Sequence, residues 1–336
     1  MYQVSILVPI YNVEKYIERC VRSLMEQTYD NIQYIFIDDC SLDRSTEILR
    51  ETISQYPKRE KNVKIISHEH NRGLSAARNT AVKNATGLFI LHVDSDDYLE
   101  KDAVDNLVNT QTLSDADIVT GLALKESKVY NSVVEIREFS SMHEATVDVI
   151  KISLRHTIWG RLIRKSLYTQ NGLHAIEGVN VGEDAQVIPQ LFFYANKVAC
   201  CFKLVYHYNC ENENSYVHKT TDINRLCKKR EQDINSYLII KNFFKDKDSE
   251  CLKEAELGVS TFAQKLMGYY VQSNDKSNFI RIKNIYNQLH YNRIKISPWH
   301  FFHNLTVYNY QLCRLTYKLL CIFAGLSKID IITLKE

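Results

Sequence analysis

The chain has 336 residues, of which 45% are hydrophobic and 24% are charged, so it can form one large globular domain with an additional segment. A formal net charge of only +2 argues against a protein whose whole surface binds nucleic acid. The nine cysteines include no Cys-x-x-Cys pair, which argues against a zinc site and favours reduced, cytoplasmic thiols.

The N-terminal part of the chain alternates between short apolar runs and segments with apolar residues at helical spacing. The runs predict buried strands, and Pro9 is expected to end the first of them, with Asn12 as a helix cap. Such alternation predicts right-handed βαβ crossovers and a mostly parallel sheet with helices on both faces. The predicted strands are residues 4–8, 34–37, 63–66 and 88–93, and the predicted helices are residues 13–27, from 43 or 45 to 53, and 74–84.

After residue 96 the pattern becomes less regular. A helix is predicted for residues 101–110, a strand for 118–120, and alternating polarity over 128–139 predicts a solvent-facing hairpin. This half is therefore expected to be a mixed sheet rather than a parallel one. From about residue 219 onward the pattern is mainly helical.

Polar residues follow the predicted strands at the point where each strand ends. They are residues 9–12, 38–39, 72–79 and 94–96. Ligands of open α/β sheets bind at the carboxyl ends of the strands, and alternate acids there can hold Mg²⁺ or Mn²⁺ against a diphosphate. The sequence therefore predicts a pocket for a nucleoside diphosphate.

Four side chains have predicted roles in this pocket. Tyr11 packs on a base, and Asp39 accepts a hydrogen bond from the imide N–H of a uracil. Arg78 neutralises phosphate, and Asp96 holds the metal. Each residue alone has an ordinary alternative as a core tyrosine, a turn or cap carboxylate, or an exposed helix charge. Their joint placement favours the binding site.

A second acidic pair, Glu183-Asp184, precedes an apolar segment much later in the chain. If the fold brings this pair to the pocket, Asp184 is the candidate general base that removes a proton from a sugar hydroxyl. The alternative is a helix start with an acidic first turn.

These motifs, in this order, resemble glycosyltransferase family 2. The resemblance covers about the first 215 residues and implies an α/β GT-A fold, which is Rossmann-like, with a C-terminal helical extension. It rests on VSILVPIYN at 4–12, IDDCSLD at 37–43, NRGLSAARN at 71–79 and DSDD at 94–97, with WGRL at 159–162 and GED at 182–184 similar to the family's acceptor-side segments.

The resemblance also implies a division of the chain and a set of roles. Residues 1–115 would form the nucleotide-sugar-binding half of the GT-A domain and residues 116–218 the acceptor-binding half. Beyond the resemblance, the pattern and composition of residues 219–336 predict a helical region that associates with a membrane or another subunit. Asp94 would contact the ribose or the donor sugar. The donor would be bound by Pro9, Tyr11, Asp39, Arg78, Asp94, Ser95 and Asp96. The acceptor side would include Trp159, Arg161 and Glu183, and the base would be Asp184. Mn²⁺ or Mg²⁺ would be held by Asp96, with His207 or His218 as further candidate ligands.

The implied reaction is inverting transfer of a hexosyl or N-acetylhexosaminyl group from a nucleotide-sugar, usually a UDP-sugar. The acceptor would be a hydroxyl of a glycan or lipid-linked glycan in the synthesis of a bacterial surface or capsular polysaccharide. Two alternatives remain open: an inactive relative that only binds a nucleotide-sugar, and a sugar-1-phosphate nucleotidyltransferase. The second would need a Gly-rich, Arg-containing loop that residues 9–12 lack. A dehydrogenase is disfavoured because no Gly-x-Gly-x-x-Gly follows the first strand.

Two residues depart from the family pattern. Cys40 replaces the usual glycine of the turn after the second strand, and a positive φ there would be strained. Arg161 stands where lysine is common, which keeps the charge but changes the geometry at an acceptor phosphate or carboxylate.

The C-terminal segment, residues 281–336, is rich in basic and aromatic residues, and its basic residues outnumber its acids. This composition suits a helix at an anionic membrane surface. The alternative is a helical cap on the catalytic domain or on a second copy of the chain. The N-terminus has no signal-peptide pattern, so we expect a cytoplasmic protein that associates peripherally with the inner face of the plasma membrane.

Overall fold

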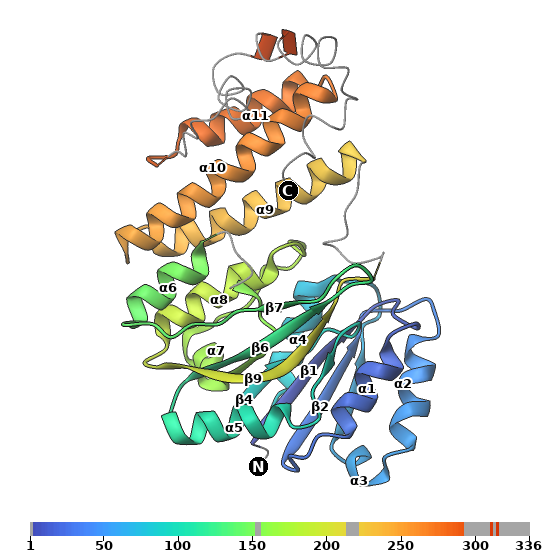
Figure 1. Ribbon diagram of the computed structural model, residues 1–336. Helices are drawn as coiled ribbons and strands as arrows, with labels where there is room; N and C mark the ends of the chain where they lie inside the picture. The colour runs from blue at the N-terminus through green and yellow to red at the C-terminus, as the bar shows by residue number, and fades with distance from the viewer. Residues whose placement is uncertain (1–2, 152–155, 213–221, 292–309, 312–313, 316–336) are drawn as a thin grey trace. The chain divides into compact units, whose positions relative to one another are not determined.

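The computed structural model describes residues 3–151, 156–212, 222–291, 310–311 and 314–315. The chain forms two compact units, Met1–His218 and Lys219–Glu336. The first unit is an α/β domain and the second is helical (Figure 1). His218, a predicted metal ligand, lies outside the described residues.

The first half of the α/β domain is built on parallel strands with the order β3-β2-β1-β4. Every residue of β1 and β2 is buried, as continuous apolar runs predict for a sheet covered on both faces. Pro9 does not end β1, which continues to Ile10. The elements are β1 (Val4–Ile10), α1 (Ile17–Met25), β2 (Ile32–Asp38), α2 (Ser45–Ser54), α3 (Pro57–Glu60), β3 (Val63–Ser67), α4 (Leu74–Asn84), β4 (Phe89–His92), β5 (Tyr98–Leu99) and α5 (Ala103–Ser114).

The second half extends the same sheet with mixed pairing, which confirms that prediction. Strand β8 is antiparallel to both β4 and β6, whereas β9 is parallel to β6. The full order is β3-β2-β1-β4-β8-β6-β9-β5, with β7 on β6 as a short hairpin. The elements are β6 (Ile118–Glu126), β7 (Ser132–Val134), α6 (Met142–Ile150), β8 (Arg161–Arg164), α7 (Lys165–Asn171), α8 (Glu183–Tyr194) and β9 (Val198–Asn209).

Alternate residues of β1 point to different helical layers. Ile6 and Val8 belong to a core cluster with residues of α1, α2 and α5, whereas Leu7 belongs to a second cluster with residues of α4, α7 and α8. This period of two is the ordinary geometry of a strand. Because both faces are covered, the open edge at the carboxyl ends of the parallel strands is where polar side chains collect.

The second unit contains α9 (Ile223–Phe244), α10 (Ser249–Gln272) and α11 (Lys276–Asn287). An aspartate side chain caps the start of each helix. Gly258 allows α10 to approach α9, since a Cβ there would lie 2.0 Å from a ring carbon of Tyr237. None of the helices in the described ranges is long and apolar enough to cross a membrane. Most of the basic and aromatic tail lies outside those ranges.

The turn after β2 contains the first departure from the family pattern. Cys40 has a φ of +63°, in the left-handed region that glycine favours. Asn12 also has a positive φ, and its Oδ1 accepts a hydrogen bond from the Leu42 N–H at 2.8 Å. The prediction that Asn12 caps a helix is therefore wrong, because α1 begins only at Ile17 and Asn12 instead ties the end of β1 to the turn after β2.

Replacing Cys40 with glycine should raise the free energy of unfolding by about 1 kcal/mol, because glycine adopts a positive φ without strain. The larger entropy of glycine in the unfolded chain offsets part of the gain. Urea unfolding measures the change. Cys40→Ala is the control, since it removes the thiol but keeps the strained backbone. An equal gain in both variants would show that the thiol, and not the backbone, is destabilising.

Candidate active site

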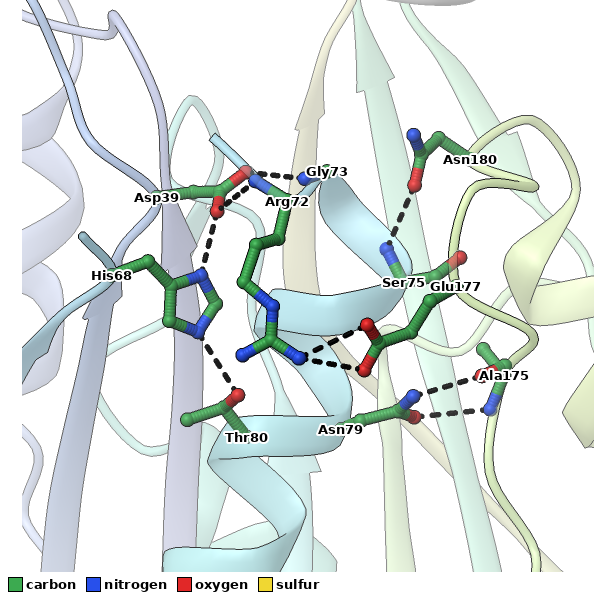
Figure 2. Close-up of polar contacts among 10 residues, drawn as sticks. All are labelled: Asp39, His68, Arg72, Gly73, Ser75, Asn79, Thr80, Ala175, Glu177 and Asn180. Carbon is green, nitrogen blue, oxygen red and sulfur yellow. Dashed lines mark hydrogen bonds and ion pairs between the residues drawn. The ribbon is translucent and has the colours of Figure 1, made fainter. Parts of the chain in front are cut away.

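Asp39 lies directly after β2 and holds the loop that leads into α4. Its Oδ1 accepts a hydrogen bond from the N–H of Arg72 at 2.9 Å and lies 2.6 Å from Nδ1 of His68. Its Oδ2 accepts from the N–H of Gly73 at 2.7 Å. Figure 2 shows these contacts converging on one carboxylate. A carboxylate has about four acceptor positions, so these three donors leave one for a ligand.

Tyr11 follows β1 and is 43% exposed. It is therefore not the core tyrosine of the alternative interpretation, and its ring is accessible to a ligand at the strand end. Its contact with a base stays a prediction, as does the base contact of Asp39. Pro9 lies within β1, opposite Ile37 of β2.

The acidic loop after β4 contains carboxylates in different environments. Asp97 is completely buried and accepts hydrogen bonds from the Tyr206 hydroxyl at 2.6 Å and from the Asn209 N–H at 2.8 Å, both from β9. These bonds fix the loop against β9. Asp96 accepts from Nδ2 of Asn212 at 2.7 Å. Asp97 thus has a structural contact that the sequence did not predict.

Burial makes this loop electrostatically unfavourable without a cation. It raises the pKa of Asp96 to about 6, and the neighbouring charge of Asp94 adds to the effect. Burial also raises the pKa of Asp97, and the neighbouring charge of Asp96 contributes more to this shift than the charge of Asp94. Oxygen ligands and excess negative charge suit Mg²⁺ or Mn²⁺, so the residues present fit the predicted metal. Ser95 is buried between these acids.

Arg78, on α4, bridges two carboxylates that are distant in the sequence. Its Nη2 donates to Asp94 at 2.8 Å, and its Nε donates to Glu183 at 3.1 Å. The Arg78 side chain is only 5% exposed. Both carboxylates help to raise its pKa although burial opposes this, so the guanidinium stays charged. The contact of Arg78 with a phosphate stays a prediction. In the structure the Arg78 side chain joins the acidic loop to the start of α8.

Glu183 and Asp184 form the first turn of α8, so the helix-start interpretation is correct and does not exclude a place in the site. Asp184 is partly exposed, and its Oδ1 accepts from the Ala185 N–H at 2.7 Å. Burial raises the pKa of Glu183 to about 7 and that of Asp184 to about 6, while the positive charge of Arg78 opposes both shifts. Asp184 therefore has a pKa suited to a general base near neutral pH.

Besides Glu183 on α8, the predicted acceptor-side residues are Arg161 on β8 and Trp159 just before it. Trp159 stacks on Tyr206 with ring centres 4.7 Å apart and on Tyr208 at 5.4 Å. Arg161 is buried and donates to the Thr157 hydroxyl at 3.1 Å. Burial lowers the pKa of Arg161 to about 10, and the charge of Asp184 acts in the opposite direction.

His207, a further candidate metal ligand, has a carboxylate next to each of its two ring nitrogens. Nε2 lies 2.7 Å from Glu100 and Nδ1 lies 3.0 Å from Glu126. The ring also stacks on Tyr98. These contacts are those of a histidine with hydrogen-bond partners on both sides, and the role of His207 as a metal ligand stays a prediction.

Helix α4 also holds a loop that no sequence pattern predicted. Asn79 exchanges two hydrogen bonds with the backbone of Ala175, at 2.8 and 3.0 Å. The Ser75 N–H donates to Asn180, and Arg72 forms an ion pair with Glu177. Figure 2 shows the three contacts along one side of α4.

The sequence did not indicate a role for His68 either. Its place directly after β3 is the signal that could have indicated one.

Comparison with known proteins identifies the family. Residues 5–170 match the profile described as "Glycosyl transferase family 2". The chain contains a domain of this family. It is 33% identical over 220 residues to "Uncharacterized glycosyltransferase EpsJ" of Bacillus subtilis (strain 168), a match covering 63% of this chain and 62% of EpsJ. It is 32% identical over 223 residues to "Glycosyltransferase GlyA" of Streptococcus pneumoniae serotype 4 (strain ATCC BAA-334 / TIGR4), covering 61% of this chain and 30% of GlyA.

These matches span less than two thirds of either relative. The family 2 chain also resembles the crystal structure of residues 1–349 of S. aureus TarS in complex with UDP-GlcNAc. The TM-score is 0.64 at 19% identity, and the match covers 94% of this chain and 92% of the TarS fragment. The predicted GT-A fold is therefore confirmed.

Replacing Arg78 with methionine should lower the free energy of unfolding by about 3–5 kcal/mol at pH 7.5, because it leaves two carboxylates without their cation. The loss should be smaller at pH 5, because burial raises the pKa of Glu183 to about 7 and this carboxylate can take up a proton in the variant. Urea unfolding at both pH values measures this.

The matched control is Arg72→Met, which removes an exposed ion pair and should cost less than about 1 kcal/mol. Equal, pH-independent losses in the two variants would contradict a charge bridge at Arg78.

Proposed function

We propose that this protein is an inverting glycosyltransferase that moves a sugar from a UDP-sugar to a hydroxyl of a glycan or lipid-linked glycan. The observation that carries the proposal is the Arg78 bridge, which brings the acidic loop at Asp94 together with the Glu183-Asp184 pair. A donor-side carboxylate cluster and an acceptor-side base are the two parts that single displacement requires.

In this mechanism Asp184 accepts the proton of the acceptor hydroxyl as that oxygen attacks the anomeric carbon. No enzyme nucleophile is needed, because the nucleoside diphosphate leaves in the same step and the configuration inverts. A divalent cation held by Asp96 would neutralise charge on the diphosphate leaving group. Asp94 and Ser95 bind the donor beside it, and Arg78 keeps Asp94 in place.

Base recognition is assigned to Asp39 with Tyr11 packed on the ring. The choice of a UDP-sugar is supported by this site and by the bound UDP-GlcNAc of TarS, whose fold is the same. Trp159 and Arg161 are assigned to the acceptor side, where the buried Trp159 ring, stacked on Tyr206 and Tyr208, would support the surface that binds the acceptor. A hexose and an N-acetylhexosamine are both compatible with these residues.

We assign the acceptor to a bacterial surface or capsular polysaccharide pathway that operates on the cytoplasmic side of the membrane. The support is the glycosyltransferase family of the chain and the basic, aromatic composition of residues 281–336. Those residues would contact an anionic membrane surface or a second copy of the chain.

The donor site is tested by calorimetric titration with UDP, with and without Mn²⁺. Binding should require Mn²⁺ and should be lost in Asp96→Ala, because the carboxylate that holds the cation is gone. Asp102→Ala removes an exposed carboxylate six residues after Asp96, just before α5, and serves as the matched control. Metal-independent binding, or equal loss in both variants, would refute the assignment of Asp96. UDP binding without transfer to any glycan acceptor would support an inactive relative.

Asp184→Asn should reduce the transfer rate by at least about a hundredfold and leave UDP affinity within about twofold, since the base acts only on the acceptor. The wild-type rate should rise with pH through a midpoint near pH 6 and level off about one pH unit higher, because Asp184 must be ionised to accept the proton and its pKa is raised to about 6. Rate measurements from pH 4.5 to 8 test this. Clearly weakened UDP binding in the variant would contradict the role of Asp184 as base.

A further inference from the structure

His68 has contacts that the proposed mechanism does not use. It follows β3, and its side chain is 5% exposed beside the equally buried side chain of Asp39. Nδ1 lies 2.6 Å from Oδ1 of Asp39, and Nε2 lies 3.0 Å from the hydroxyl of Thr80 on α4. Figure 2 shows the three side chains in one line.

The chemistry of these groups fixes their hydrogen bonds. An ionised carboxylate only accepts, so Nδ1 of His68 must carry the proton that faces Asp39. In a neutral ring Nε2 is then the acceptor, and the Thr80 hydroxyl donates to it. Thr80 thereby holds the ring in the tautomer that donates to Asp39.

The contact with His68 changes what Asp39 can offer a ligand. The N–H groups of Arg72 and Gly73 occupy one acceptor position on each carboxylate oxygen. His68 occupies the second position on Oδ1, so the remaining position is on Oδ2. A single acceptor position suits one ring N–H. Uracil carries such an imide N–H, whereas cytosine has an unprotonated nitrogen at the same place, whose lone pair would face the carboxylate.

We propose that His68, oriented by Thr80, is a positioning residue that leaves Asp39 one acceptor position and so makes the donor site select a base with an imide N–H over cytosine. This inference rests on the proposed function. Without His68 a second acceptor position opens on Oδ1, and the amino group of cytosine can then donate to it.

The test is calorimetric titration with UDP and with CDP, in the presence of Mn²⁺. Wild-type protein should prefer UDP. His68→Leu should weaken UDP binding about tenfold and lower the UDP-to-CDP affinity ratio by about tenfold, as expected for loss of a hydrogen bond to a charged group. His68→Asn places an amide N–H where Nδ1–H was, so it should keep both values within about threefold of wild type. Thr80→Val should lower the ratio in the same direction, by less.

The outcomes separate this inference from the proposed function. Wild-type protein that binds UDP, with an unchanged UDP-to-CDP ratio in folded His68→Leu and Thr80→Val, would overturn the inference alone. Wild-type protein that binds neither nucleotide would overturn both. A structural role for His68 predicts lower stability with an unchanged ratio, and urea unfolding of each variant distinguishes it. If His68→Leu does not fold, Thr80→Val and His68→Asn decide the question.

Discussion

The buried ion pairs of Arg78 are the interaction on which the site depends. A guanidinium removed from water is stable only with anionic partners, and Arg78 has Asp94 on one side and Glu183 on the other. Because these acids belong to the end of β4 and the start of α8, their shared cation fixes the distance between the two halves of the domain. The proposed base, Asp184, is adjacent to one end of the bridge.

The same region holds more negative charge than its cations neutralise. Burial raises the pKa values of Asp96, Asp97, Glu183 and Asp184. The fold tolerates this charge because Asp97 accepts hydrogen bonds from β9 and because Arg78 compensates the acids nearest to it. A cation and a substrate with polar groups would relieve what remains. The raised pKa values therefore agree with a ligand site. A cluster with a purely structural role would explain them poorly.

Helix α4 connects the proposed base-binding residue Asp39 to a loop in the proposed acceptor-binding half of the domain. Asp39 holds the backbone just before its N-terminal end and His68 contacts Thr80 within it, while Asn79 and Ser75 hold the loop of residues 175–180. Gly73 is required at this junction, since it has a φ of +88° and a Cβ there would lie 2.3 Å from the Asn180 amide. A shift of α4 would thus disturb both proposed binding regions at once.

The sequence by itself determined the parallel strands of the first half, the acidic turns at their ends and the start of α8, because periodicity and turn chemistry act over a few residues. It did not predict β9, the role of Asn12 or the place of His207. Nor could it pair Arg78 with Glu183 or Asp39 with His68. Those contacts join segments far apart in the chain, and only the packing of helices on both faces of the sheet decides which side chains meet.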